Sequence, residues 1–205
     1  MNKTKLFLSI FGKAQRKYSK SSKRLAGEGW GKSWKTLIAT IYSAQSRDEL
    51  TVPVMTHAFA ELPSVRAWAN APVSKIEKLT KKINFYKTKS KNAKATAGKL
   101  MKDFHGKVPR TIEELTTLPG VGRKTANLIM TECHGKPGIT VDTHVHRISN
   151  VLGLVKTKTP HETEIALMKI APKRYWRKIN RVFVLWGKNV RGREKRKLME
   201  KINLS

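Results

Sequence analysis

Hydrophobic residues recur at helical spacing along almost the whole chain. A first amphipathic segment covers about residues 3–18, and the most apolar one, Trp34 to Ala44, reads Trp-Lys-Thr-Leu-Ile-Ala-Thr-Ile-Tyr-Ser-Ala. We expect this second segment to be a central, buried helix. Convincing runs of alternating β-branched residues, which would indicate half-buried strands, are missing. The pattern therefore predicts an all-α fold.

Capping residues and helix breakers divide the rest of the chain into further helices. Thr111-Ile112-Glu113-Glu114 has the spacing of a capping box and predicts the start of a short helix. Asp142 is placed to cap another helix. The remaining helices are predicted at about residues 47–61, 64–70, 74–81, 90–104, 121–133, 162–170, 174–186 and 193–202.

The segment Leu118-Pro119-Gly120-Val121-Gly122-Arg123-Lys124-Thr125-Ala126 predicts a tight hairpin between two helices. Glycines at 120 and 122 permit positive φ angles and a close backbone approach. Pro119 presets the φ angle of the turn. The first N–H groups of the next helix have no partner within it and lie at the positive end of its dipole. The hairpin is therefore predicted to bind an anion such as a DNA phosphate.

Two reactive side chains accompany the hairpin. Lys124 lies just inside the next helix, where the helix dipole and the neighbouring Arg123 disfavour its protonated form and free an amine for attack. Asp142 follows 18 residues after Lys124, within Val141-Asp142-Thr143-His144-Val145. At a helix N-cap it stays ionised, and such an anion stabilises the cationic sugar formed when a glycosidic bond breaks. The alternatives are a lysine that only contacts a phosphate and an aspartate that only caps a helix.

The charge of the chain restricts its partner. Its 205 residues include 43 Lys and Arg against 14 Asp and Glu, a formal net charge of +29. Such an excess repels itself in a compact fold and suits a polyanion. The length allows one domain or two small lobes. Charge alone leaves open a general solubility bias or a basic ribosomal-type protein.

Cysteine content and apolar stretches indicate the compartment. The single cysteine, Cys133, excludes an intramolecular disulfide and an all-cysteine metal site, and it favours a reducing environment. Residues 6–11 form an apolar stretch too short for a membrane span, without a clear signal cleavage site. We therefore expect a protein of the cytoplasm, associated with the nucleoid in a prokaryote or nuclear in a eukaryote, that is not secreted and has no membrane partner.

The hairpin, Lys124 and Asp142, in this order and at this spacing, resemble the helix-hairpin-helix DNA glycosylases, most closely the endonuclease III family. Similar stretches outside the hairpin are Leu37 to Gln45, Asn84 to Lys89, and Gly106-Lys107-Val108-Pro109, and the match spans about residues 33–155. The resemblance implies two helical lobes with a DNA-binding cleft between them. One lobe is a bundle of residues 33–142 with the helix-hairpin-helix motif at about 111–133, and the other combines residues 1–32 and 143–205.

The activity implied by the resemblance is base-excision DNA repair. The chain would be a bifunctional DNA glycosylase/AP lyase that removes oxidised pyrimidines from double-stranded DNA and cleaves the strand at abasic sites. Lys124 would attack C1′, expel the base and form a Schiff base, and β-elimination would follow. Asp142 would stabilise the sugar cation. The protein is expected to act as a monomer.

The resemblance also implies which residues bind DNA. Gln45 would enter the space left by the extruded base, and Phe85, where relatives usually have leucine, would be a wedge residue, with core packing as the alternative. His144 would line the cleft or be a packed structural residue. The other implied DNA-binding residues are Lys89, Leu118, Gly120, Val121, Gly122 and Arg123.

One departure from the family concerns its cofactor. Family members commonly carry four cysteines near the C-terminus that bind a [4Fe–4S] cluster. The corresponding stretch here, residues 184–193, has none. We therefore expect no cluster, no other cofactor and no metal. Packing of Trp176, Phe183 and Trp186 is expected to hold the second lobe instead.

Two other functions remain open on the sequence. A uracil or thymine mismatch DNA glycosylase would share the fold and Asp142. A non-catalytic helix-hairpin-helix DNA-binding protein would need the hairpin and the charge, but it gives no reason for Asp142 or Gln45. The sequence does not identify the damaged base.

Overall fold

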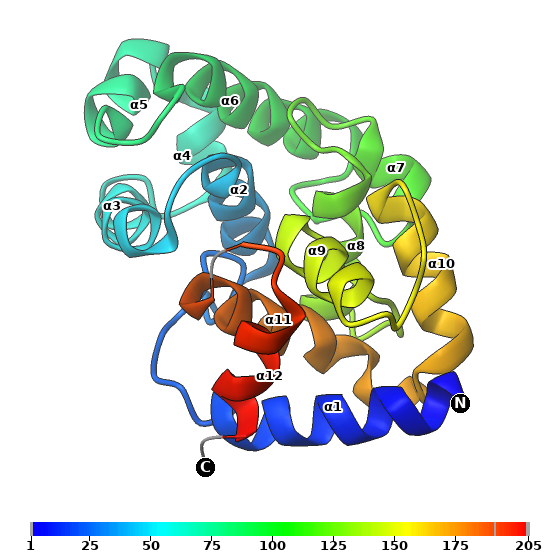
Figure 1. Ribbon diagram of the computed structural model, residues 1–205. Helices are drawn as coiled ribbons and strands as arrows, with labels where there is room; N and C mark the ends of the chain where they lie inside the picture. The colour runs from blue at the N-terminus through cyan, green and yellow to red at the C-terminus, as the bar shows by residue number, and fades with distance from the viewer. Residues whose placement is uncertain (1, 191, 204–205) are drawn as a thin grey trace. The chain divides into compact units, whose positions relative to one another are not determined.

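The computed structural model describes residues 2–190 and 192–203, and every regular element in these ranges is a helix (Figure 1). The α-helices are α1 (Lys3–Tyr18), α2 (Ser33–Ser43), α3 (Asp48–Glu61), α4 (Val65–Asn70), α5 (Val73–Thr80), α6 (Tyr86–Asp103), α7 (Ile112–Thr116), α8 (Arg123–Glu132), α9 (Thr143–Val151), α10 (Pro160–Ile170), α11 (Trp176–Asn189) and α12 (Lys195–Asn203). A 3-10 turn, η1 (Lys173–Tyr175), precedes α11. The prediction of an all-α fold is confirmed. Within the described residues, no helix combines the length and the apolar character that crossing a bilayer requires.

The chain forms two compact units. One is continuous, residues 24–136, and contains α2 to α8; the other joins residues 1–23 to residues 137–205 and contains α1 and α9 to α12. Both unit borders fall earlier in the chain than the expected lobe borders after residues 32 and 142. Asp142 therefore belongs to the discontinuous unit, whereas Lys124 belongs to the continuous one.

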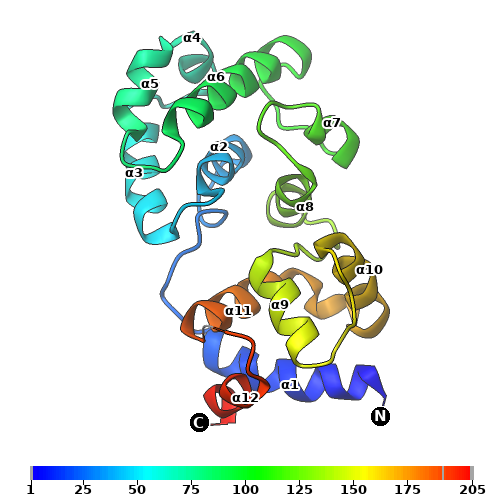
Figure 2. The same cartoon turned by 45° about the horizontal axis from the view of Figure 1, so that its top comes forward.

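Helix α2 forms the centre of the continuous unit, because its apolar residues are buried on almost every side. It packs against α3, α6 and α8 (Figures 1 and 2). Trp34 of α2 meets the ring of Phe59 edge-on at 5.4 Å between centroids, and Phe59 continues to Trp68 at 5.7 Å. Burial of each such side chain contributes about 2 kcal/mol, so this aromatic chain is a main source of stability in the unit.

The discontinuous unit is built on contacts between the two ends of the chain. Helix α1 lies along α11, with Phe11 6.0 Å from Phe183 and Tyr18 6.5 Å from Trp186 between ring centroids. Phe183 and Trp186 are fully buried, which confirms them as core residues. Trp176 is only half-buried, and its Nε1 donates to the Ala171 carbonyl at 2.8 Å.

Two helices begin at other residues than predicted, and both differences affect candidate site residues. Helix α6 begins at Tyr86 rather than near residue 90, because Phe85 adopts a left-handed conformation that ends the preceding loop. Lys89 therefore lies in the first turn of a helix. Helix α8 begins at Arg123 rather than near Val121, with Gly122 as its N-cap.

Candidate active site

The hairpin between α7 and α8 is a tight turn anchored on α6. The Val121 N–H donates to the Leu118 carbonyl at 3.1 Å. With Pro119 second and a positive-φ glycine third, residues 118–121 have the arrangement of a type II turn. The Oγ1 of Thr96 on α6 donates to the Pro119 carbonyl at 2.8 Å. The side chains of Leu118 and Val121 are buried in the core and hold the hairpin on the helical bundle. Their expected DNA-binding role stays a prediction for their backbone atoms alone.

The two hairpin glycines have different conformations. Gly120 has φ +77°, and a Cβ atom there would lie 3.0 Å from the Cβ and Nδ2 atoms of Asn92. Gly122 has φ −91°, and a Cβ atom there would meet nothing within 4 Å. The expectation of positive φ at both positions is therefore wrong for Gly122, because an N-cap residue has extended backbone. Among the described residues, the amides of Gly120 and Gly122 donate to no acceptor.

Lys124 lies in the first turn of α8, as the sequence predicts, and its side chain is exposed. Within residues 2–190 and 192–203 its amine makes no hydrogen bond and no ion pair. Arg123 precedes it and is also exposed. The amine therefore stands at the positive end of a helix dipole, two residues after Gly122, whose amide is unbonded like that of Gly120.

Asp142 is the N-cap of α9, which confirms the capping prediction. Its Oδ1 accepts the Val145 N–H at 2.8 Å, and the side chain is half-buried. One carboxylate oxygen is thus held by the helix start, and the residue's other oxygen is not needed for this cap. The arrangement fixes an anion at a defined place in the discontinuous unit.

Arg147, one turn further along α9, fastens the end of α11. Its guanidinium donates to the carbonyls of Val190 at 2.9 Å and Gly187 at 3.1 Å, and also to that of Gly192. Burial and the charge of Arg193 lower the pKa of Arg147, and the negative charge of Asp142 partly offsets them. The sequence analysis missed this residue, because its acceptors are backbone atoms 40 to 45 residues later in the chain.

The stretch held by Arg147 overlaps residues 184–193, where the family resemblance would place the ligands of an iron–sulfur cluster. Its side chains offer no thiolate, and Val184, Leu185 and Trp186 are buried in the core. The single cysteine, Cys133, is the C-cap residue of α8 in the other unit. Within the described part of the chain, no three His, Cys, Asp or Glu side chains gather where they could hold a metal. The residues present therefore do not fit a cubane cluster, which needs thiolate ligands.

His144 packs against α11 at a point of close helix approach. A Cβ atom at Gly187 would lie 2.5 Å from its Nδ1 and 2.9 Å from its Cβ. The ring is half-buried and has a partner among the described residues. This packing favours the structural alternative for His144.

Gly187→Ala is expected to destabilise the protein by about 1–3 kcal/mol, because the new methyl group collides with the histidine ring. Gly98→Ala is the matched control: this glycine is also helical, and a Cβ atom there meets nothing within 4 Å. The control should gain roughly 0.5–1 kcal/mol from helix propensity. Denaturant unfolding measures the change in unfolding free energy of both variants. Equal stability of the two variants would contradict the proposed collision. Adding His144→Ala to Gly187→Ala should remove the collision and restore part of the lost stability.

Gln45 and Phe85 lie at the ends of two loops of the continuous unit. Gln45 follows α2 with φ +52°, and Phe85 precedes α6 with φ +57°. Both are exposed, and Phe85 retains 64% of its accessible surface. That exposure rules out the core-packing alternative for Phe85. The Nδ2 of Asn84 donates to the Gln45 carbonyl at 3.1 Å, which joins the loops.

Lys89 does not reach the surface, so its expected DNA contact is corrected. It is 7% exposed, and its Nζ donates to the carbonyls of Ala44 at 2.5 Å and Tyr42 at 2.9 Å and to Ser46 Oγ at 3.1 Å. Burial lowers the pKa of Lys89 to about 8. The amine is therefore still mainly protonated at neutral pH, and it donates hydrogen bonds to carbonyls at the end of α2.

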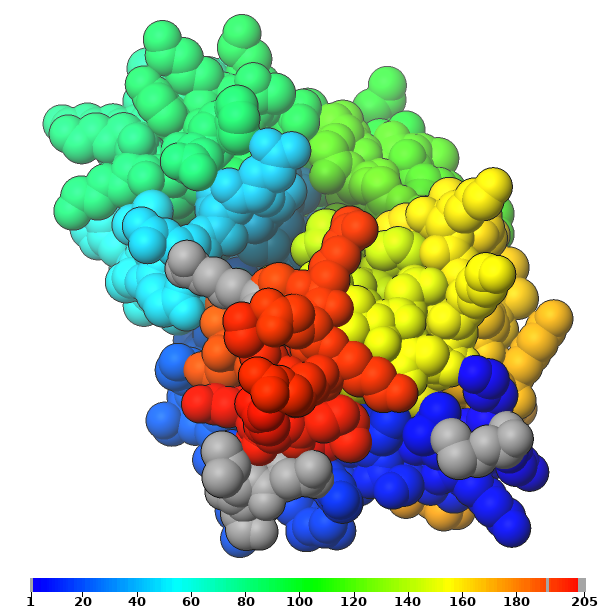
Figure 3. All heavy atoms as spheres, viewed as in Figure 1, coloured from blue at the N-terminus to red at the C-terminus, as the bar shows by residue number. Residues whose placement is uncertain are grey.

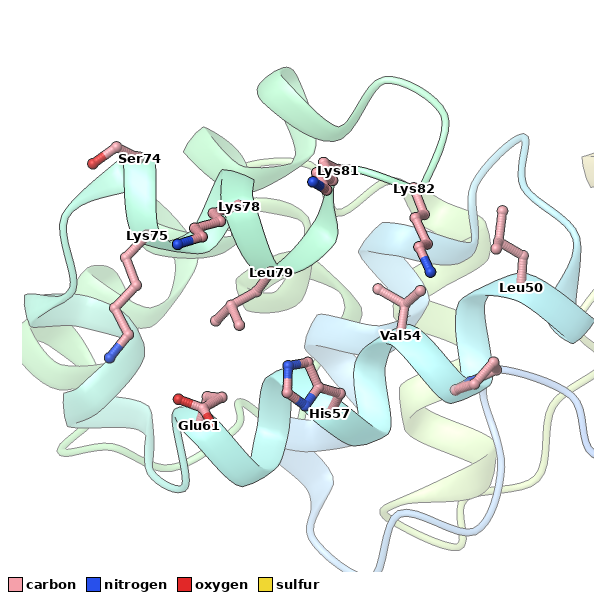
Figure 4. Close-up of a pocket in the computed structure, with 11 residues that line it drawn as sticks. Leu50, Val54, His57, Glu61, Ser74, Lys75, Lys78, Leu79, Lys81 and Lys82 are labelled. Atoms are coloured by element: carbon pink, nitrogen blue, oxygen red, sulfur yellow. The ribbon is translucent and has the colours of Figure 1, made fainter.

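A groove of about 1000 Å³ lies between α3 and α5, away from every predicted site residue. In Figure 4, Leu79 of α5 points toward Val54 and His57 of α3. Side chains of α5 and the loop after it stand out from the surface in Figure 3 (the green region), and the exposed ones include Lys75, Lys78, Lys81 and Lys82. The predicted site residues lie instead on loops and helix starts.

The HhH-GPD superfamily of base excision DNA repair proteins matches residues 38–173. The endonuclease III of Thermotoga maritima is 40% identical over 157 residues, which cover 77% of this chain and 74% of that protein. The endonuclease III of Bacillus subtilis is 35% identical over 153 residues, covering 74% and 70%.

Solved structures of endonuclease III and of other DNA glycosylases have the same fold as this chain. An endonuclease III trapped as a covalent intermediate with DNA has a TM-score of 0.83 at 30% identity, covering 91% of this chain and 86% of the other. A thermostable thymine-DNA glycosylase shares the fold, with a TM-score of 0.76 at 21% identity, covering 90% and 85%.

The chain belongs to the HhH-GPD superfamily of base excision DNA repair proteins. Within it, the chain is an endonuclease III homologue, a DNA-binding glycosylase/AP lyase of base excision repair. The resemblance noted in the sequence is confirmed, and so is its enzymatic function as against a non-catalytic DNA-binding module.

Proposed function

We propose that this enzyme removes oxidised pyrimidines from duplex DNA and then cleaves the strand, with Lys124 as the nucleophile and Asp142 as the stabilising anion. The observation that carries the proposal is the unengaged, exposed amine of Lys124 in the first turn of α8. Mismatch glycosylases that only remove a base have no use for an amine there. The protein acts as a monomer and without a cluster, since its residues do not fit one.

The proposed chemistry follows from the reactivity of these two groups. The amine of Lys124 attacks C1′, the C1′–N bond breaks, and the base leaves with a proton. The lysine nitrogen loses a proton and the sugar ring opens to give an imine. Loss of a C2′ proton then breaks the C3′–O bond, which is β-elimination. Asp142 stabilises the positive charge that develops on the sugar while the C1′–N bond is breaking.

The hairpin supplies the register for this attack. The unbonded amides of Gly120 and Gly122 and the start of α8 bind one DNA phosphate. Because Lys124 is two residues after Gly122, gripping this phosphate places its amine beside the neighbouring sugar. Base contacts are not needed for that positioning.

The proposal is tested on duplexes that carry thymine glycol, uracil, 8-oxoguanine or an abasic site. We expect excision of thymine glycol with strand cleavage, and a covalent complex after borohydride reduction on the thymine glycol and abasic duplexes. Excision of uracil without any reducible imine would identify the mismatch glycosylase alternative instead.

Gly120→Ala is expected to cost about 1–3 kcal/mol of stability, because it combines a left-handed φ with a contact on Asn92. It should also weaken binding to damaged and undamaged duplex alike, since the displaced hairpin cannot grip the phosphate. Gly98→Ala is the control, because Gly98 lies within α6, outside the hairpin, and a Cβ atom there meets nothing within 4 Å. Thermal unfolding and fluorescence anisotropy at one fixed salt concentration measure both effects. A Gly120→Ala protein with the parent's stability and affinity would show that the hairpin tolerates a side chain there.

A further inference from the structure

The two exposed loop residues are held in an unfavourable backbone conformation. Gln45 and Phe85 have φ +52° and +57°, a region that costs a non-glycine residue of order 1 kcal/mol or more. Such a conformation persists only where surrounding contacts over-determine it. The contacts around these two loops therefore hold Gln45 and Phe85 in this conformation.

Lys89 supplies contacts on both sides of Gln45. Its Nζ bonds the carbonyls of Tyr42 and Ala44 at the end of α2 and the hydroxyl of Ser46 beyond it, so one ammonium group encloses the turn that contains Gln45. Three acceptors satisfy the three N–H groups of the ammonium. Removing the amine would take this donor away from the buried Tyr42 carbonyl and the partly buried Ala44 carbonyl.

The same lysine is joined to Phe85 through the backbone. The Lys89 N–H donates to the Phe85 carbonyl at 3.0 Å as the first helical bond of α6. Asn84, directly before Phe85, donates from Nδ2 to the Gln45 carbonyl at 3.1 Å. The loops of Gln45 and Phe85 are therefore connected twice, by a buried ammonium and by an exposed amide.

The residue after Lys89 fixes this arrangement to the bundle. Ser90 is fully buried, and its Oγ bonds the Tyr42 hydroxyl at 2.9 Å and Thr80 Oγ1 at 3.1 Å. Helices α2, α5 and α6 thus meet in one hydrogen-bonded group beneath the loops. The start of α6 cannot shift along α2 without breaking it.

We propose that Lys89 and Asn84 are positioning residues that lock the Gln45 and Phe85 loops together, so that both side chains enter the duplex as one rigid wedge. The inference rests on the proposed function and on the role in base extrusion that the family resemblance implies for Gln45 and Phe85. Ordering two loops in advance removes an entropic cost that flexible loops would meet on every encounter with a stacked base. Lys89 itself touches no DNA.

The test replaces Lys89 by methionine, which keeps the aliphatic stem and removes the amine. Single-turnover excision of thymine glycol should fall about tenfold, since extrusion of a stacked base needs the wedge. Cleavage at a preformed abasic site should fall much less, because no base has to be extruded. Asn84→Ala should show the same split to a smaller degree. A general loss of folded protein would lower both reactions equally.

A second readout needs no chemistry. A 2-aminopurine opposite a tetrahydrofuran abasic-site analogue reports disturbed stacking when the wedge enters. Lys89→Met at saturating concentration should give a smaller fluorescence change than the parent. A parent that gives no change would overturn the wedge. A parent that gives the change but excises no thymine glycol would overturn the proposed substrate and leave the lock standing.

The double variant Lys89→Met/Gln45→Ala decides whether the lysine acts through Gln45. If it does, the double variant is no worse in excision than Gln45→Ala alone, because the losses are not additive. Additive losses, or a Lys89→Met protein with the parent's excision rate, would overturn the lock. Lys87→Met is the control, since Lys87 is an exposed lysine of the same helix turn without a contact among the described residues. It should match the parent in both readouts.

Discussion

Lys124→Gln is expected to lose borohydride trapping and to cleave abasic-site DNA roughly a thousandfold or more slowly than the parent. An amide nitrogen is not nucleophilic and cannot form an imine with C1′. The side chain is exposed and makes no contact among the described residues, so its replacement should leave folding unchanged. Single-turnover cleavage on a gel and trapping of labelled duplex measure the loss.

Lys124→Arg separates the amine from its positive charge. Arginine keeps the positive charge beside Arg123 and leaves the phosphate-binding amides of the hairpin unchanged. Its guanidinium stays protonated and cannot attack C1′. It should bind DNA like the parent, by anisotropy at the same salt concentration, and be as inactive as Lys124→Gln. A reducible complex in either variant would show that another amine is the nucleophile.

Asp142→Asn is expected to keep the fold and to lose base excision by about a thousandfold. Asparagine caps helices as well as aspartate, so the bond to the Val145 N–H can persist. The neutral amide cannot stabilise the sugar cation. Thermal unfolding and single-turnover excision measure the two properties separately. Strand cleavage at a preformed abasic site should be less affected, because no glycosidic bond remains to be broken.

A second helix cap provides the matched control for Asp142. Thr159 caps α10 in the same unit, with its Oγ1 accepting the Glu162 N–H at 3.2 Å. Thr159→Ala should lose about 1 kcal/mol of stability and keep its excision rate. The two variants should thus show opposite patterns. Near-normal excision by Asp142→Asn would reduce this residue to a structural cap.

The local features of the site could be predicted from the sequence. The turn at Pro119 and Gly120, the position of Lys124 in a helix start and the capping by Asp142 each depend on a few neighbouring residues. Backbone conformation and helix capping are set over such short distances. Helical periodicity likewise predicted the all-α fold and the buried α2.

The packing roles that the sequence did not reveal depend on partners far away in the chain. Lysine is usually a surface residue, but the amine of Lys89 is buried against acceptors that lie 43 to 47 residues earlier in the chain. Leu118 and Val121 belong to the core because the hairpin lies on α6. His144 meets α11 only because Gly187 lets the two helices approach.

The sequence by itself determined the reactive groups, the hairpin and the helices, because these follow from short-range rules of backbone conformation and charge. Only the tertiary structure decided which polar and apolar side chains remain available to DNA. That choice depends on which surfaces are buried when helices pack. Packing buries the amine of Lys89, which then bonds the backbone, and it leaves the ring of Phe85 exposed to solvent.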